Sequence, residues 1–160
     1  MTSEAALGVL ATELGRKLGP RDWVLLEGPM GAGKTTFAKY LLEARGVRRP
    51  PEGSPTFALA HEYRGDAGDL VHMDLYRLRS AAELDEAGIP DFFWARDAVV
   101  ICEWLSMWPV FEAQVRAEAA RGGRVVYQVE LSFGGVLGEP GRENEREVRI
   151  TRRDSSVAVR

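Results

Sequence analysis

Residues 28–35 constrain the fold more than any other part of this chain. They read GPMGAGKT and fit the pattern G-x-x-x-x-G-K-[ST]. Small residues let successive backbone N–H groups turn inward around a phosphate, and a helix that begins there adds its positive end. A plain glycine turn would also fit, but the expected context is present on both sides, with a short apolar run at 23–27 and a helical stretch at 35–44. We therefore predict a P-loop that binds nucleoside triphosphate.

The positions of such a loop have separate chemical roles. The ammonium of Lys34 reaches the β- and γ-phosphates, where it also serves catalysis, and the hydroxyl of Thr35 is a ligand of Mg²⁺. We predict that the whole loop and the start of its helix contact the nucleotide, through Gly28, Pro29, Met30, Gly31, Ala32, Gly33, Lys34, Thr35 and Thr36.

Hydrophobic spacing predicts strands and helices around this loop. A first helix, capped by Ser3, carries leucines at helical spacing and ends at Gly19. We expect an α/β P-loop NTPase in which helices flank a mainly parallel sheet with a C-terminal antiparallel strand pair, and a single domain over residues 1–160. Residues 134–145 are predicted to be a mobile loop. Further helical segments are expected at 81–86 and 110–121, and strands at 56–64, 70–74, 98–104, 125–133 and 146–152.

Composition narrows the range of functions. The 160 residues carry a net charge of −3, which argues against nucleic-acid binding over the whole surface. The single cysteine, Cys102, excludes an internal disulfide and a zinc cluster built on cysteines. The sequence has no apolar run of about 18 residues, and its first residues lack the basic start of a signal peptide. We expect a cytoplasmic protein without membrane contact.

Two carboxylates end apolar runs and are candidates for metal and water chemistry. Asp74 follows LVHM, and Glu103 follows VVIC. A P-loop protein needs an acid at the end of a neighbouring strand to hold Mg²⁺, and a group that orients the attacking nucleophile. Either residue could be a solvated acid at a strand end, but two of them in one P-loop chain favour the functional interpretation. The sequence has no N-K-x-D box, so a GTPase is not expected.

Five stretches in the same order resemble the TsaE family, small bacterial ATPases of tRNA threonylcarbamoyladenosine synthesis. They are GPMGAGKTTFAKYLL at 28–42, SPTF at 54–57, HMDLYRL at 72–78, an EL…GI.D.F pattern at 83–93, and ICEW at 101–104. HMDLYRL downstream of SPTF is much more specific than the P-loop. The resemblance covers about residues 1–105. The family commonly has a proline after its E-W, whereas Leu105 stands here, so residues 106–160 are interpreted from their pattern alone.

The resemblance implies a protein that binds ATP or ADP with Mg²⁺ and hydrolyses ATP weakly on its own. It implies that the TsaD and TsaB proteins are partners, that this chain supports their multiple turnover, and that tRNA is an indirect partner through the complex. The threonylcarbamoyl group is transferred to the adenosine beside the anticodon. By resemblance, Glu103 lies near Mg²⁺, Asp74 is the catalytic carboxylate that positions the lytic water, and the Thr56 hydroxyl senses the γ-phosphate in a switch-like loop.

Two other functions stay open on the residues alone, a small-molecule kinase and an adaptor that senses nucleotide without hydrolysing it. Tyr76, Arg77 and Trp104 are candidates to face the nucleotide or a partner protein. The alternatives are that Trp104 packs at the sheet edge and that Arg77 pairs with an acid. His72 is interpreted as structural, and the aromatic residues 92–94 as core or as a docking surface.

Overall fold

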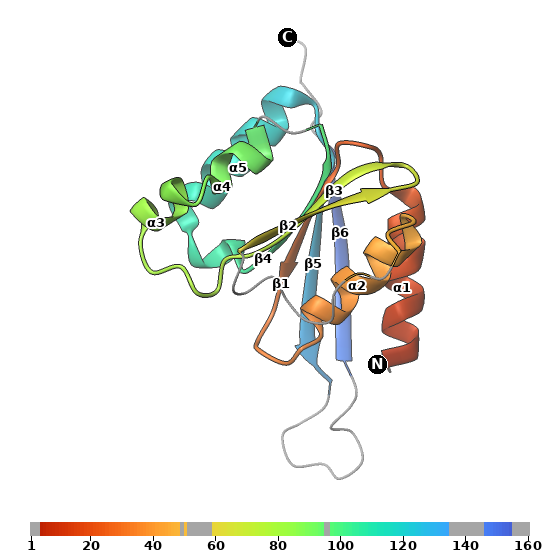
Figure 1. Ribbon diagram of the computed structural model, residues 1–160. Coiled ribbons are helices and arrows are strands. Elements are labelled where there is room, and N and C mark those ends of the chain that lie inside the picture. Colours follow the sequence, from red (N-terminus) through yellow and green to blue (C-terminus); the bar gives the residue numbers. More distant parts are fainter. Residues whose placement is uncertain (1–3, 49, 51–58, 95–96, 135–145, 155–160) are drawn as a thin grey trace.

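Figure 1 shows the computed structural model, which describes residues 4–48, 50, 59–94, 97–134 and 146–154. Within these residues the strands form one six-stranded sheet with helices on both faces. None of the helices in this part of the chain combines the length and the apolar character that crossing a bilayer requires. In chain order the elements are α1 (Glu4–Lys17), β1 (Trp23–Glu27), α2 (Lys34–Ala44), β2 (Ala60–Gly65), β3 (Gly68–Asp74), α3 (Ala81–Glu86), α4 (Ile89–Trp94), β4 (Val99–Glu103), the 3-10 helix η1 (Leu105–Met107), α5 (Pro109–Gly122), β5 (Val126–Phe133) and β6 (Arg146–Arg153).

The sheet has the strand order β2-β3-β4-β1-β5-β6. The central strands β3, β4, β1 and β5 run parallel, and β6 pairs antiparallel with β5. This arrangement confirms the predicted α/β fold with a mainly parallel sheet and a C-terminal antiparallel pair. A second antiparallel strand, β2, lies on the opposite edge of the sheet, where the sequence analysis had not specified a direction.

The hairpin of β2 and β3 differs from its predicted boundaries. The strand predicted at 56–64 runs from Ala60 to Gly65, and residues 56–58 lie outside the described part of the chain. The turn after β2 is tight, because Gly65 pairs with Gly68 and β3 begins there, two residues before the predicted start at 70. Gly68 has a φ of +112°, which glycine adopts at little steric cost, so the chain reverses within two residues. The predicted Ser3 cap and residues 135–145 of the predicted loop also lie outside the described residues.

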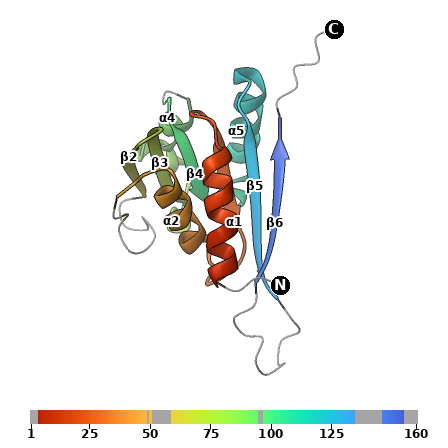
Figure 2. The ribbon, with the colours of Figure 1, turned by 90° about the vertical axis from the view of Figure 1, so that its right-hand side faces the viewer.

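The alternating side chains of β1 divide the hydrophobic core between the two faces of the sheet. Val24 and Leu26 pack in the core beneath α1 and α2, whereas Trp23 and Leu25 pack in the core beneath α4 and α5. Figure 2 shows α1 and α2 side by side over the first of these faces. Every residue of β1 is buried, and the strand is an uninterrupted apolar run that ends in a single acid.

The short helix α4 was not predicted as an element. Gly88, with a φ of +67°, separates it from α3. Phe93 is fully buried, and its ring centroid lies 5.1 Å from that of Trp23 and 5.8 Å from that of Phe111. The aromatic cluster therefore serves the core at Phe93, while Trp94 beside it is 38% exposed.

Candidate nucleotide-binding site

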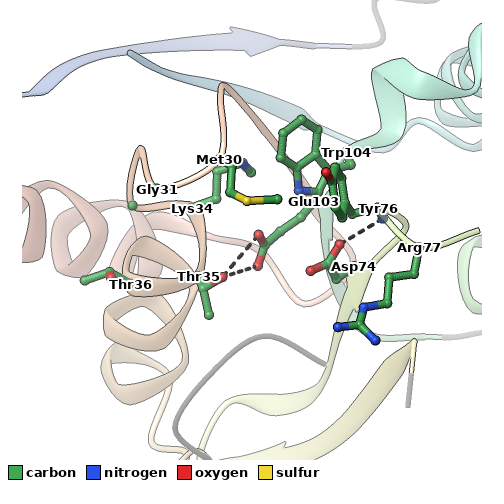
Figure 3. Close-up of a pocket in the computed structure, with 11 residues that line it drawn as sticks. Met30, Gly31, Lys34, Thr35, Thr36, Asp74, Tyr76, Arg77, Glu103 and Trp104 are labelled. Carbon is green, nitrogen blue, oxygen red and sulfur yellow. Dashed lines mark hydrogen bonds between the residues drawn. The ribbon is translucent and has the colours of Figure 1, made fainter. Parts of the chain in front are cut away.

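A pocket of about 400 Å³ opens at the carboxyl ends of three parallel strands (Figure 3). The chain leaves β1 toward α2 on one face of the sheet and leaves β4 toward α5 on the other, so a crevice opens between these two strands. Open α/β sheets bind ligands at such a switch point. The pocket is lined by Met30, Gly31, Gly33, Lys34, Thr35, Thr36, Asp74, Tyr76, Arg77, Glu103 and Trp104.

The loop between β1 and α2 depends on glycine at both of its ends. Gly28 has a φ of +140°, and a β-carbon at this position would collide with the carbonyl oxygen of Leu131 on β5. Gly33 has a φ of +102° directly before α2 begins at Lys34. A loop of this kind presents backbone N–H groups to an anion, and the N-terminus of the helix adds the positive end of its dipole.

The ammonium of Lys34 lies inside the pocket. Its Nζ donates hydrogen bonds to the carbonyl oxygens of Gly28 (2.7 Å) and Pro29 (2.9 Å), and it lies 3.8 Å from the centroid of the Trp104 ring. Burial lowers the pKa of Lys34, while the carboxylates that end β4, β3 and β1 act in the opposite direction. The pocket thus holds a positive charge whose neighbouring acids favour its protonated form.

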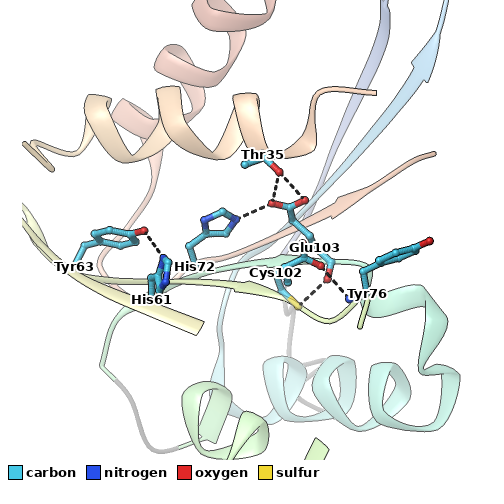
Figure 4. Close-up of polar contacts among 8 residues, drawn as sticks. Thr35, His61, Tyr63, His72, Tyr76, Cys102 and Glu103 are labelled. Atoms are coloured by element: carbon cyan, nitrogen blue, oxygen red, sulfur yellow. Dashed lines mark hydrogen bonds and ion pairs between the residues drawn. The ribbon is translucent and has the colours of Figure 1, made fainter. Parts of the chain in front are cut away.

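Glu103 is the centre of a buried polar network (Figure 4). Thr35 Oγ1 donates to Glu103 Oε1 at 3.1 Å and to Oε2 at 3.3 Å. His72 Nε2 lies 2.8 Å from Glu103 Oε1, and the two side chains are only 3% and 2% exposed. Glu103, the predicted acid near Mg²⁺, therefore contacts the hydroxyl of Thr35, the predicted Mg²⁺ ligand. His72, interpreted as structural from the sequence, is a direct partner of that acid.

Asp74 lies beside Glu103 because the two residues are in register on the parallel strands β3 and β4. It is 4% exposed, and its Oδ1 accepts a hydrogen bond of 2.9 Å from the backbone N–H of Tyr76. Among the described residues, no group of three or more His, Cys, Asp or Glu side chains could hold a metal ion. Mg²⁺ commonly uses one or two carboxylates together with substrate phosphates. The oxygen donors present here fit a metal that arrives with phosphates.

Aromatic side chains form one wall of the pocket. Trp104 has a φ of +66°, an uncommon conformation for a bulky residue. Its ring lies 4.9 Å from that of Tyr76 at an angle of 43°, and Tyr76 remains 40% exposed. Arg77 lies on the same wall (Figure 3). Of the alternatives that the sequence left open for these three residues, the geometry favours a position facing the pocket.

Glu27 is a buried acid that the sequence analysis did not single out. It ends β1, and its carboxylate accepts hydrogen bonds from the backbone N–H (2.9 Å) and the hydroxyl (2.6 Å) of Ser106 in η1. Burial raises the pKa of Glu27, and the bonds from Ser106 only partly offset this. The available signal was a charged residue at the end of a fully apolar strand, directly before the loop. This contact ties the base of the loop to the segment that follows Glu103.

Not all of the residues predicted to contact nucleotide line the pocket, and the contacts of all of them with nucleotide stay predictions. Gly28 and Pro29 offer their carbonyl oxygens to Lys34 and are not among the residues that line the pocket. Ala32 is fully buried. Thr56 lies outside the described residues. The other predicted loop residues line the pocket.

Comparisons with known proteins identify relatives of this chain. The sequence matches the family described as "Threonylcarbamoyl adenosine biosynthesis protein TsaE" over residues 1–125. It is 37% identical over 108 residues to the tRNA threonylcarbamoyladenosine biosynthesis protein TsaE of Aquifex aeolicus, a match that covers 65% of this chain and 73% of that protein. The proteins of the same name from Streptomyces coelicolor and Bacillus subtilis are 43% and 40% identical, over 58% and 53% of this chain and 65% and 51% of their own lengths.

The fold is also similar to a solved structure. The crystal structure of Bacillus subtilis YdiB superposes with a TM-score of 0.62 at 26% sequence identity, and the match covers 92% of this chain and 79% of that one. This similarity extends well beyond the residues that carry the sequence motifs, so it supports the P-loop fold for most of the chain.

Proposed function

Because the chain belongs to the TsaE family, we propose that it is the ATP-hydrolysing component of tRNA threonylcarbamoyladenosine synthesis. In this proposal it binds ATP and ADP with Mg²⁺ and supports repeated turnover by the TsaD and TsaB proteins, through which it acts on tRNA. One observation carries the proposal: an ammonium, a hydroxyl and two carboxylates converge on one pocket at the switch point of the sheet. These groups belong to Lys34, Thr35, Asp74 and Glu103.

The P-loop holds ATP through its phosphates. Lys34 already directs its ammonium at two carbonyl oxygens of the loop. Charged phosphate oxygens accept stronger hydrogen bonds than neutral carbonyls, so the ammonium exchanges these partners for the β- and γ-phosphates. A Lys34→Ala variant therefore loses most of its ATP binding.

Thr35 and Glu103 would hold Mg²⁺ together with the phosphates. The hydroxyl and carboxylate oxygens are hard ligands, and the hydrogen bonds between them keep both groups at the same side of the pocket. A Mg²⁺ ion held there would neutralise negative charge on the phosphates.

Asp74 orients the water that attacks the γ-phosphorus. The backbone N–H of Tyr76 fixes its carboxylate, which accepts a hydrogen bond from that water. A bond forms between the water oxygen and the γ-phosphorus, the bond from that phosphorus to the β–γ bridging oxygen breaks, and ADP leaves. The surplus proton of the water passes to solvent, directly or by way of Asp74.

An isosteric substitution at Asp74 distinguishes a role in ATP hydrolysis from a role in ATP binding. We expect Asp74→Asn to bind ATP within about 3-fold of the wild-type affinity while its turnover with TsaD and TsaB falls about 10²- to 10⁴-fold, the range for loss of a positioned acid or base. Asp69→Asn is the matched control, because Asp69 lies near the opposite end of the same strand and pairs with Arg64 on the surface. Binding is measured by calorimetry, and phosphate release is measured with and without the TsaD–TsaB pair.

The other two functions give different results in the same experiment. A small-molecule kinase would consume ATP in response to a metabolite and not to the protein pair. A nucleotide-sensing adaptor would bind ATP tightly and release no phosphate under any condition. Either result, or full turnover in Asp74→Asn, would overturn the proposal.

A further inference from the structure

We infer that His72 is a positioning residue for the proposed magnesium site, because its imidazole fixes the carboxylate of Glu103 in the orientation that the metal requires. This inference rests on the proposed function and adds to it a residue that contacts neither the metal nor the nucleotide.

The contact between His72 and Glu103 is short and enclosed. The distance from Nε2 to Oε1 is 2.8 Å, and the side chains are 3% and 2% exposed. An ionised carboxylate only accepts hydrogen bonds, so Nε2 of His72 carries the hydrogen and donates it. A buried carboxylate that accepts a hydrogen bond keeps one orientation, because leaving the charged group without that bond in the interior costs free energy.

The two donors to Glu103 differ because only Thr35 is itself a proposed ligand of the metal. Thr35 Oγ1 donates to both carboxylate oxygens, but it is itself a proposed ligand of Mg²⁺. The lone pairs of this oxygen serve the metal, while its single hydrogen is shared between Oε1 and Oε2 and does not select one of them. His72 has no such second role, and its bond is to Oε1. It therefore holds one oxygen of Glu103 and leaves Oε2 toward the metal.

Strand geometry explains why this histidine is available. Side chains alternate along a strand, so His72 and Asp74, two positions apart on β3, lie on the same face. β4 pairs with β3 in register, which sets Glu103 beside Asp74 and within reach of His72. Residues that hold metal ligands from outside the coordination sphere typically change metal affinity about 10- to 100-fold when they are replaced.

The inference is tested by two amides of different reach. The side-chain nitrogen of Gln lies near the position of histidine Nε2, whereas that of Asn lies near Nδ1, so His72→Gln can keep the donor and His72→Asn cannot. His72→Leu removes the donor altogether. His61→Leu is the control, because His61 lies opposite His72 on β2 and its ring nitrogen contacts Tyr63.

The measurement is the binding of the fluorescent analogue mant-ATP over a series of Mg²⁺ concentrations and in EDTA. We expect the half-saturating Mg²⁺ concentration to rise about 10-fold or more in His72→Asn and His72→Leu and to stay within about 3-fold of wild type in His72→Gln. Binding in EDTA stays within about 2-fold for every variant, and His61→Leu follows wild type throughout.

The outcomes separate this inference from the proposed function. Equal losses with and without Mg²⁺, or Asn and Gln variants that respond to Mg²⁺ alike, would make His72 a structural residue and overturn the inference. A wild-type protein that binds mant-ATP equally in Mg²⁺ and in EDTA would overturn the proposed metal site itself, and the inference with it. Should His72→Leu fail to fold, the Asn and Gln pair still decides.

Discussion

Replacing Gly28 with alanine tests whether the first glycine of the loop is required by the fold or only by the nucleotide. Its φ of +140° is a conformation that L residues rarely adopt, and the new β-carbon would meet the carbonyl oxygen of Leu131. That oxygen belongs to β5, a main-chain atom in a paired strand, so it cannot rotate away as a flexible side chain could.

The expected cost follows from these two features. A strained backbone conformation costs about 1–3 kcal/mol, and displacement of a packed neighbour costs about 1–3 kcal/mol more. Gly28→Ala is thus expected to lower the free energy of unfolding by about 2–6 kcal/mol, a large part of the roughly 5–15 kcal/mol typical of a domain. Gly123→Ala is the matched control, because Gly123 has a φ of +62° and, apart from its chain neighbours, no atom of the described residues lies within 4 Å of its would-be β-carbon. That variant is expected to lose only about 1–2 kcal/mol.

The assay is equilibrium unfolding in urea, followed by far-UV circular dichroism, with no nucleotide in the sample. Gly28→Ala should unfold at a clearly lower urea concentration than Gly123→Ala. Equal midpoints for the two variants would refute the reasoning. So would a Gly28→Ala protein that keeps wild-type stability and loses only ATP binding, because the glycine would then serve the ligand and not the contact with β5.

Two further changes test the core and the buried acid. Burial raises the pKa of Glu27 above its ordinary 4.5, so the folded state binds more protons than the unfolded state above pH 4.5 and the wild type loses stability as pH rises toward the raised pKa. Glu27→Gln cannot titrate, so its stability relative to wild type should increase over that range in urea titrations at successive pH values, and parallel pH profiles would contradict this. Phe93→Ala should cost about 3–5 kcal/mol, because the ring is fully buried against Trp23. Phe133→Ala, at a position 49% exposed, is its control in the same unfolding assay. Equal losses of unfolding free energy in the two variants would contradict a core role for Phe93.

The sequence could predict those features that depend on neighbouring residues. The strand–loop–helix unit at 23–44 is local, and its glycines, lysine and threonine stand at fixed spacings. The end of β3 was predicted at Asp74, and that of β4 was predicted one residue beyond Glu103, because an acid follows each apolar run.

Contacts between distant strands could not be predicted in the same way. His72 and Glu103 are 31 residues apart, and Glu27 and Ser106 are 79 apart. Each contact depends on strand order and register, and parallel strands that are buried on both faces have no alternating pattern from which either could be predicted. The left-handed backbone of Trp104 was equally hidden, since a tryptophan gives no local signal for a positive φ. Sequence reasoning therefore singled out Asp74 and Glu103, but neither Glu27 nor the contacts that hold these acids.

Strand order also accounts for the different roles proposed for the two acids. β4 pairs directly with β1, the strand that leads into the loop, whereas β3 is one strand further away. Neighbouring strands are about 4.8 Å apart, so the acid on β4 starts nearer to the loop than the acid on β3. The nearer acid is the longer one, Glu103, and it reaches Thr35 at the start of α2. The more distant acid is the shorter Asp74, held back by the N–H of Tyr76. A group that shares a metal with the loop has to be near it, and a group that orients water beyond the γ-phosphate has to stand apart. The proposed roles of Glu103 and Asp74 thus follow from the order β3-β4-β1 and from one methylene of side-chain length.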